Sequence, residues 1–155
     1  MRVVVQRTRF SAVHIEGQPT VRCNQGMTVL LGVGKGDVEK DADFLAAKIS
    51  KLRIFEDENG KMNLAIREIG GECLIVSQFT LYGDCRKGNR PGFDQAADPE
   101  TANRLYEYFV EKVRSEGITV HTGTFQAEMG VELWNDGPVT FILESPGAKN
   151  ETKEQ

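Results

Sequence analysis

Hydroxyl and amide side chains follow an apolar run near the middle of the chain. Ser77-Gln78-Phe79-Thr80 comes directly after Cys73-Leu74-Ile75-Val76, a run with the composition of a buried strand. Ligand sites in open α/β sheets are commonly built at the carboxyl ends of strands, so these side chains are candidate hydrogen-bonding groups for a ligand. Ser and Thr are also common at ordinary strand ends, and the segment by itself leaves a structural role open.

A second candidate segment, Asn135-Asp136-Gly137-Pro138-Val139-Thr140, lies far along the chain. Gly137 allows the backbone to approach another group closely because it has no Cβ atom. Pro138 makes a cis peptide bond accessible, although only about one X-Pro bond in twenty is cis in folded proteins. On residue types alone, this segment is an ordinary turn between two apolar runs.

The usual partners of a covalent nucleophile are missing from the sequence. A Thr80 hydroxyl would need an adjacent general base, and neither His14 nor His121 lies in a motif that would orient it toward Thr80. The sequence contains neither a G-x-S-x-G turn nor a Cys–His signature. We therefore expect no covalent intermediate, and we expect both histidines to be polar residues on strands.

Nucleotide and metal chemistry are not predicted. Gly32-Val33-Gly34-Lys35-Gly36 has the glycines of a phosphate-binding loop but lacks the G-x-x-x-x-G-K-[ST] pattern. No group of His, Cys and Asp residues has the sequence spacing of metal ligands. We therefore expect no cofactor and no metal ion.

The bulk properties predict an ordinary cytoplasmic domain. A chain of 155 residues fits one domain, and no apolar run approaches the length needed to span a membrane. No secretory signal is visible at the N-terminus. Cys23, Cys73 and Cys85 form no C-x-x-C pair, which predicts reduced thiols.

One loop departs from the acidic character of the chain. The formal net charge of −4 argues against a protein that coats nucleic acid non-specifically. Between residues 83 and 93, Arg86, Lys87 and Arg90 stand against Asp84, three positive charges minus one negative, a local balance of +2. The loop is either a solvated surface segment or a contact for nucleic-acid phosphates.

Apolar and β-branched runs predict the strands, and two apolar stripes predict helices. Strands are expected at 1–8, 27–33, 53–55, 72–78, 118–121, 130–134 and 139–143, with a hairpin formed by 12–15 and 20–22. Asp37 is the predicted N-cap of a first helix and Asp98 of a second, which has Pro99 in its first turn and Gly117 after its end. The apolar stripes consist of Val38, Ala42, Leu45, Ile49 and Leu52, and of Ala102, Leu105, Phe109 and Val113.

This pattern predicts a single α/β domain over residues 1–144, with two main helices packed on layered β-sheets. Residues 145–155 are small, polar and charged, which predicts a disordered C-terminal tail.

Together, segments 77–83 and 135–140 resemble those of the D-aminoacyl-tRNA deacylases, the D-tyrosyl-tRNA deacylase family. These enzymes hydrolyse the ester between a D-amino acid and the 3′ end of tRNA. Residues 1–7, 31–37, 59–63, 90–93 and 122–129 also follow the family's order, so the resemblance covers Met1 to about Glu144. Gly92 departs from the Ser that is more frequent there, which loosens the loop but removes no proposed catalytic group. The resemblance implies a sandwich or barrel-like body and a homodimer.

The resemblance also implies roles for individual residues. The backbone N–H groups of Phe79 and Thr80 would stabilise the oxyanion of ester hydrolysis, with Ser77 and Gln78 as supporting hydrogen-bonding residues. Thr80 would position the substrate, and the vicinal hydroxyl of the terminal ribose would assist the reaction. Ala127 and Met129 would border the pocket, and Arg86, Lys87 and Arg90 would meet tRNA phosphates.

For chirality, the resemblance implies a filter made by the partner subunit. The Gly137–Pro138 bond would be cis and would enter the partner's pocket, where its carbonyl groups would hold the substrate's ammonium group and exclude an L side chain. This filter would also admit glycine, which has no side chain to reject, so that glycyl-tRNA would be hydrolysed in the same proofreading step. Arg7 would brace the Gly137–Pro138 segment.

Two other functions remain open from the sequence. A non-catalytic RNA-binding module would use the basic loop to bind RNA without turnover. An esterase acting on free D-aminoacyl esters or peptides would not need the RNA part of the substrate.

Overall fold

The strand β1 (Arg2–His14) organises the main sheet of this computed structural model, which describes residues 1–147. It pairs antiparallel with β3 (Gly26–Gly32) along its first half and with β8 (Gly130–Glu144) along both halves. Register shifts in the β1–β8 ladder between Gln6 and Ser11 bend the strand, as bulges do. The second half of β1 then forms the predicted hairpin with β2 (Val21–Cys23).

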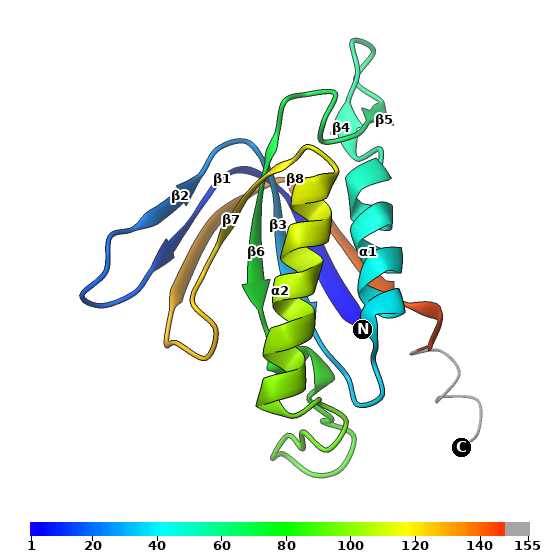
Figure 1. Ribbon diagram of the computed structural model, residues 1–155. Coiled ribbons are helices and arrows are strands. Elements are labelled where there is room, and N and C mark those ends of the chain that lie inside the picture. The colour runs from blue at the N-terminus through cyan, green and yellow to red at the C-terminus, as the bar shows by residue number, and fades with distance from the viewer. Residues whose placement is uncertain (148–155) are drawn as a thin grey trace.

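Parallel pairing extends the sheet on the other side of β3. The strand β6 (Glu72–Ser77) pairs parallel with β3, and β7 (Thr119–Thr122) pairs parallel with β6. The hydrogen-bonded order is β2-β1-β3-β6-β7, with β8 on β1, and this mixed sheet curls into a nearly closed, barrel-like layer (Figure 1). The short strands β4 (Phe55–Glu56) and β5 (Met62–Leu64) form a second, small sheet. The predicted α/β class is confirmed.

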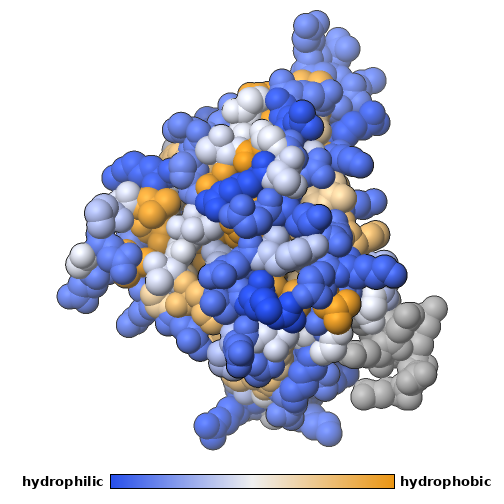
Figure 2. Space-filling view, in the orientation of Figure 1, coloured by the Kyte–Doolittle hydropathy of each residue, from blue (hydrophilic) through white to orange (hydrophobic). Residues whose placement is uncertain are grey.

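The helices α1 (Glu39–Lys51) and α2 (Pro99–Ser115) lie side by side on one face of the sheet (Figure 1). Their buried residues pack against the apolar side chains of β1, β3 and β6, and together these form the main core. The exposed surface of the helices is mostly hydrophilic, as Figure 2 shows, because each apolar stripe faces inward. Every residue of the stripe predicted for α2 is buried.

The two predicted N-caps have different outcomes. Asp98 caps α2 as expected, and its carboxylate accepts a hydrogen bond from Thr101 N at 3.0 Å. Asp37 does not cap α1, since the N-cap residue is Val38. The Asp37 carboxylate instead accepts a hydrogen bond from Gly34 N and pairs with the Met1 ammonium group, both at 2.7 Å. The carboxylate that was expected to cap the helix is therefore engaged in a tertiary ion pair.

The last strand also differs from the prediction. Two strands were expected at 130–134 and 139–143, but β8 is one strand from Gly130 to Glu144 that includes the Gly137–Pro138 segment. The sequence predicts a tail from residue 145, yet Ser145 is buried and its Oγ accepts a hydrogen bond from the Met1 ammonium group. Residues 148–155 of the predicted tail lie outside the described residues. Among residues 1–147, no helix has the length and apolar character needed to cross a membrane.

Candidate active site

A short 3-10 helix, η1 (Phe79–Tyr82), turns the chain directly after β6. The last residues of β6 are held in the sheet, and Gln78 N still donates to Leu31 O at 2.8 Å. The next backbone donor that is used is Leu81 N, which donates to Gln78 O. Phe79 and Thr80 are the first two residues of η1, and their N–H groups have no acceptor among residues 1–147. Two adjacent backbone donors are therefore available to a ligand.

A cavity of about 560 Å³ opens beside these donors. It lies between the carboxyl end of β6, the first turn of α2 and the segment before β8. It is lined mainly by apolar side chains and includes Ser77, Gln78, Phe79, Ala127 and Met129 among its walls. The structure thus brings together five of the residues that the sequence singles out, from segments about fifty positions apart.

Phe125 and Gln126 also line this cavity, and no role was predicted for either. Gln126 has a φ of 63°, which non-glycine residues seldom adopt, so the loop that carries it has an unusual backbone path. Gly123 makes room for Met129, because a Cβ atom at position 123 would lie 2.5 Å from the Met129 sulfur. The close approach at Gly123 is a signal that depends on the fold and is not visible in the sequence.

Thr80 lies at the edge of the site, outside the lining of this cavity. Its side chain is exposed, and its hydroxyl accepts a hydrogen bond from the Gln78 amide. His14 is hydrogen-bonded to Glu132 and His121 to Glu72. No carboxylate or imidazole among residues 1–147 hydrogen-bonds to the Thr80 hydroxyl, so the described residues supply no general base for it.

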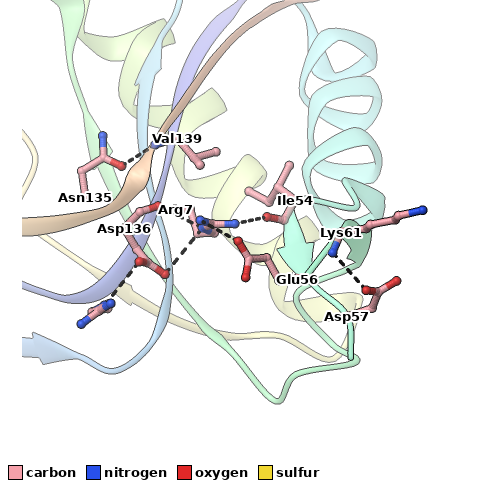
Figure 3. A network of polar contacts seen from close by, with 9 residues as sticks. Arg7, Ile54, Glu56, Asp57, Lys61, Asn135, Asp136 and Val139 are labelled. Atoms are coloured by element: carbon pink, nitrogen blue, oxygen red, sulfur yellow. Dashed lines mark hydrogen bonds and ion pairs between the residues drawn. The ribbon is translucent and has the colours of Figure 1, made fainter. Parts of the chain in front are cut away.

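Gly137 and Pro138 are exposed on β8, outside the same cavity, and the peptide bond between them is cis. Gly137 has a φ of 138°, and an added Cβ would lie 2.6 Å from Val139 Cγ2. The side chain of Asn135 closes this part of the strand, because its Oδ1 accepts a hydrogen bond from Val139 N at 2.9 Å (Figure 3).

Arg7 holds the same segment from the neighbouring strand β1 (Figure 3). Its side chain is buried, and its Nε donates to the carbonyl oxygen of Asp136 at 3.0 Å. One terminal nitrogen donates to Ile54 O at 2.9 Å, while the other lies 3.9 Å from a Glu56 carboxylate oxygen. Arg7 therefore fixes the carbonyl group that directly precedes Gly137.

The basic loop is closed by paired backbone hydrogen bonds between Asp84 and Gly92, at 2.7 and 2.9 Å. Asp84 and Arg86 form a two-pronged ion pair with both distances at 2.9 Å, and these hydrogen bonds hold the pKa of the Asp84 carboxyl well below its usual range. Lys87 and Arg90 are exposed and have no carboxylate partner among residues 1–147. Arg86 also lines a second cavity, of about 390 Å³, together with Arg2 and Lys35.

The structure brings together one group of side chains that could hold a metal ion, which the sequence spacing does not predict. Cys23, Glu72 and His121 offer ligand atoms that all lie within 4.8 Å of one another. They come from three strands and have no recognisable spacing in the sequence, so only the fold reveals them.

Comparison with known proteins gives matches over nearly the whole chain. The family model described as "D-Tyr-tRNA(Tyr) deacylase" matches residues 4–144. A D-aminoacyl-tRNA deacylase of Clostridioides difficile (strain 630) is 59% identical over 145 residues, covering 94% of this chain and 97% of that protein. A solved structure named "c-Myc DNA Unwinding Element Binding Protein" is 39% identical, with a TM-score of 0.87 and coverage of 94% and 99%.

A probable eukaryotic D-amino acid tRNA deacylase shares the fold, with a TM-score of 0.78 at 19% identity, over 92% of this chain and 98% of that one. The likeness therefore extends over essentially the whole described body. The chain belongs to the D-Tyr-tRNA(Tyr) deacylase family, whose members are hydrolases of the ester bond in aminoacyl-tRNA.

Proposed function

We propose that this protein hydrolyses the ester bond of D-aminoacyl-tRNA and releases the D-amino acid and the tRNA, as a proofreading step in the cytoplasm. The observation that supports this most directly is the pair of free N–H groups at Phe79 and Thr80, beside the 560 Å³ cavity. Two such donors suit the oxyanion of a tetrahedral intermediate. Each is worth about 3 kcal/mol of transition-state stabilisation when it is correctly placed.

The reaction needs a nucleophile and a proton acceptor. A water molecule attacks the carbonyl carbon, the carbonyl oxygen becomes the oxyanion, and the bond to the ribose oxygen then breaks. The leaving ribose oxygen takes up a proton as the carboxylate forms. The described residues offer Thr80 no base, so we assign proton transfer to the vicinal ribose hydroxyl and a positioning role to Thr80.

This assignment predicts the effect of removing the ribose hydroxyl. A D-aminoacyl-tRNA whose terminal adenosine lacks the 2′-hydroxyl should react about 10²- to 10⁴-fold more slowly, the usual contribution of acid–base catalysis, with little change in KM. Single-turnover kinetics on a stably 3′-linked substrate measures both quantities. Unchanged turnover would show that the protein itself supplies the base.

Selection for the D configuration is assigned to Gly137–Pro138 of the partner subunit. Both residues are exposed on β8, and Arg7 and Asn135 fix the backbone on either side of them. Two carbonyl oxygens presented by a fixed backbone can hold an ammonium group and leave no room for an L side chain. Glycyl-tRNA should also be a substrate, because glycine has no side chain to reject.

A homodimer is supported by the surface of β8. Only Val139 of its fifteen residues is buried, and its exposed apolar side chains include Val131, Trp134, Phe141 and Ile142. Since β8 pairs only with β1 among the described strands, this long apolar strand also has an unpaired edge. An exposed apolar strand with an unpaired edge is normally buried against another surface. We propose that this surface belongs to a second copy of the chain.

The tRNA backbone is assigned to the basic loop. Lys87 and Arg90 are exposed cations, whereas Arg86 is already engaged by Asp84. We therefore expect Lys87 and Arg90 to contribute more to tRNA affinity than Arg86. Their contribution should weaken with added salt, as phosphate contacts do.

The first experiment compares four substrates: D-aminoacyl-tRNA, L-aminoacyl-tRNA, glycyl-tRNA and a free D-aminoacyl ester. We expect rapid hydrolysis of D-aminoacyl-tRNA and glycyl-tRNA. L-aminoacyl-tRNA and the free D-aminoacyl ester should not be hydrolysed. Equal turnover of the free ester would favour the esterase. Binding without turnover would favour a nucleic-acid-binding module. This alternative is worth testing because one 39% identical solved structure is named "c-Myc DNA Unwinding Element Binding Protein".

A further inference from the structure

The seam between the two end strands of the sheet carries an unassigned cluster of metal-binding side chains. Cys23 ends β2, Glu72 begins β6 and His121 lies on β7, with all three ligand atoms within 4.8 Å of one another. His121 Nε2 lies 3.0 Å from Glu72 Oε1. We infer that Cys23, Glu72 and His121 form a binding site for a zinc-class divalent cation.

The fold brings these residues together at the seam where the two end strands of the sheet approach each other. In the hydrogen-bonded order, β2 and β7 are the opposite ends of the path, and each pairs with a single strand among those described. They approach each other where the barrel-like sheet nearly closes. A cation bound to Cys23 and His121 would join the two ends across this seam, with Glu72 of β6 as the third ligand.

The surroundings orient the ligands. Asn24 N donates to Glu72 Oε1 at 3.0 Å, and the Asn24 side-chain amide lies 3.5 Å from the other carboxylate oxygen. These two contacts with Asn24 hold the Glu72 carboxylate in place beside His121. Metal ligands in proteins are commonly oriented by such outer hydrogen bonds.

The environment of Cys23 also suits a bound thiolate. Ser11 lies directly opposite Cys23 in the β1–β2 ladder, so the two side chains share a face. The Ser11 hydroxyl is buried and has no hydrogen-bond partner among residues 1–147. It is therefore available to donate to the sulfur once the thiol has lost its proton. Val13, Leu74 and Val76 pack with Cys23 and keep this side of the site apolar.

The donor set indicates the class of metal. One thiolate, one imidazole and one carboxylate suit zinc or cobalt, whereas magnesium and calcium prefer oxygen ligands alone. Ligand atoms around tetrahedral zinc are separated by about 3.3 to 3.8 Å, so the cluster needs to contract by only about one ångström. His121 and Glu72 are 32% and 23% exposed, which leaves a fourth position open to water.

A Cys–His nucleophile is the competing interpretation of this cluster. Cys23 is only 2% exposed, and its burial raises the pKa of the thiol to about 11. The hydrogen-bond partner of His121 Nε2 among residues 1–147 is the Glu72 carboxylate and not the Cys23 thiol. A buried, protonated thiol is a poor nucleophile for a large substrate but can still lose its proton to a metal.

The site is separate from the candidate active site. Glu72 is the first residue of β6 and Ser77 the last, so the two sites lie about 17 Å apart along the strand. The cation should therefore stabilise the barrel seam without taking part in ester hydrolysis. The inference does not depend on the proposed function, because its readouts are metal binding and stability.

The test is titration of the full chain with Co²⁺, followed by absorption spectroscopy. The expected spectrum combines a sulfur-to-cobalt charge-transfer band with the visible bands of tetrahedral cobalt, saturating at one cobalt per chain. Cys23→Ser should abolish the charge-transfer band, and His121→Gln should weaken binding by about 100-fold or more, since even outer-shell changes cost about 10- to 100-fold. The matched controls are Cys85→Ser and His14→Gln, an exposed thiol and a histidine outside the cluster.

Thermal unfolding with Zn²⁺ gives an independent readout. Zn²⁺ should raise the Tm of the unaltered protein and of both control variants, and should leave the Tm of Cys23→Ser and His121→Gln unchanged. Mg²⁺ should have no such effect. The inference is overturned if the charge-transfer band does not form, if it is lost in Cys85→Ser and kept in Cys23→Ser, or if Zn²⁺ shifts all variants alike.

Discussion

Thr80 is one of the two residues whose backbone N–H groups have no acceptor among residues 1–147, and the surroundings of its hydroxyl fit a positioning role. Its hydroxyl is engaged by the Gln78 amide and by no carboxylate or imidazole among residues 1–147. The groups proposed to bind the oxyanion are the backbone N–H groups of Phe79 and Thr80. A substitution of the Thr80 side chain leaves both of them in place.

We therefore expect Thr80→Ala to retain deacylation of D-aminoacyl-tRNA within about tenfold of the unaltered rate, since loss of a true nucleophile costs about 10⁴- to 10⁶-fold. Single-turnover assays measure this directly. Thr80→Ser serves as the matched control, because it keeps the hydroxyl and removes only a methyl group. Mass-spectrometric detection of an acyl group on Thr80 would contradict the positioning role.

Arg7 and Arg9 offer a comparison of two cations that approach the same residue. Arg7 is buried and donates to Asp136 O, whereas Arg9 is 62% exposed and pairs with the Asp136 carboxylate at 3.3 Å. Only Arg7 also anchors Ile54 O, so only Arg7 ties the Gly137–Pro138 segment to the body of the domain.

Arg7→Met should lower the free energy of unfolding by about 2–4 kcal/mol, because it leaves the buried Ile54 carbonyl group and the part-buried Asp136 carbonyl group without their donor. It should also reduce the discrimination between D- and L-aminoacyl-tRNA. Arg9→Met should cost less than about 1 kcal/mol, as exposed ion pairs do. Urea unfolding and paired assays of the two substrates measure these effects. Equal losses in both variants would remove the bracing role from Arg7.

At the scale of elements, the sequence predicts most of what depends on local patterns. The stripe predicted for α2 is correct throughout, because an amphipathic helix shows its buried face in its own spacing. The stripe predicted for α1 is correct at Ala42, Leu45 and Ile49, but Val38 is exposed and caps the helix, and Leu52 is half-buried at its other end. Asp98 directly precedes α2 and is its cap, whereas Asp37 lies two residues before α1, whose N-cap is Val38. The Asp37 carboxylate instead pairs with the ammonium group of Met1, which is far away in the sequence.

Features that depend on register could not be predicted. The Asn-Asp-Gly-Pro residues signal a turn, but β8 continues through them because its ladder with β1 absorbs the irregularity in register shifts. Similarly, Glu72 and His121 meet because β6 and β7 pair in parallel, and Cys23 joins them from β2. The apolar run before Ser77, by contrast, correctly predicts the strand β6 and its end, since the end of a strand is a local signal.

The loop between β3 and α1 should be unusually sensitive to the charge of Asp37. Asp37→Asn leaves the fully buried Met1 ammonium group without its negative partner, which should lower the free energy of unfolding by about 3–5 kcal/mol. Asp41→Asn is the matched control, since the Asp41 carboxylate accepts a capping hydrogen bond from Val38 N in an exposed setting and should cost only about 1 kcal/mol. Urea unfolding at neutral pH distinguishes the two. Similar small losses would show that the buried ion pair contributes little.

At the scale of the whole molecule, one face of the sheet is covered by helices, whereas β8 exposes apolar side chains. One face is covered by α1 and α2 and holds the main core. On β8, by contrast, Ile142 is 68% exposed and Trp134 is 53% exposed, with Trp134 packed edge-on against Phe10. An apolar surface of this kind is costly for a monomer, and it surrounds the exposed Gly137–Pro138 segment that is proposed to act in the partner's pocket.

A charge placed on this surface should therefore break assembly and activity together. Ile142→Asp would introduce two buried carboxylates into a symmetric dimer, one per copy, and should weaken dimerisation by at least about 100-fold. Deacylation of D-aminoacyl-tRNA should fall in parallel with the dimer fraction measured by sedimentation, because each pocket would lose the other subunit's filter. Phe44→Asp is the matched control, since Phe44 is an apolar residue 42% exposed on α1, and it should leave both quantities unchanged. A monomeric Ile142→Asp variant with full activity and intact preference for the D configuration would show that each chain selects its substrate alone.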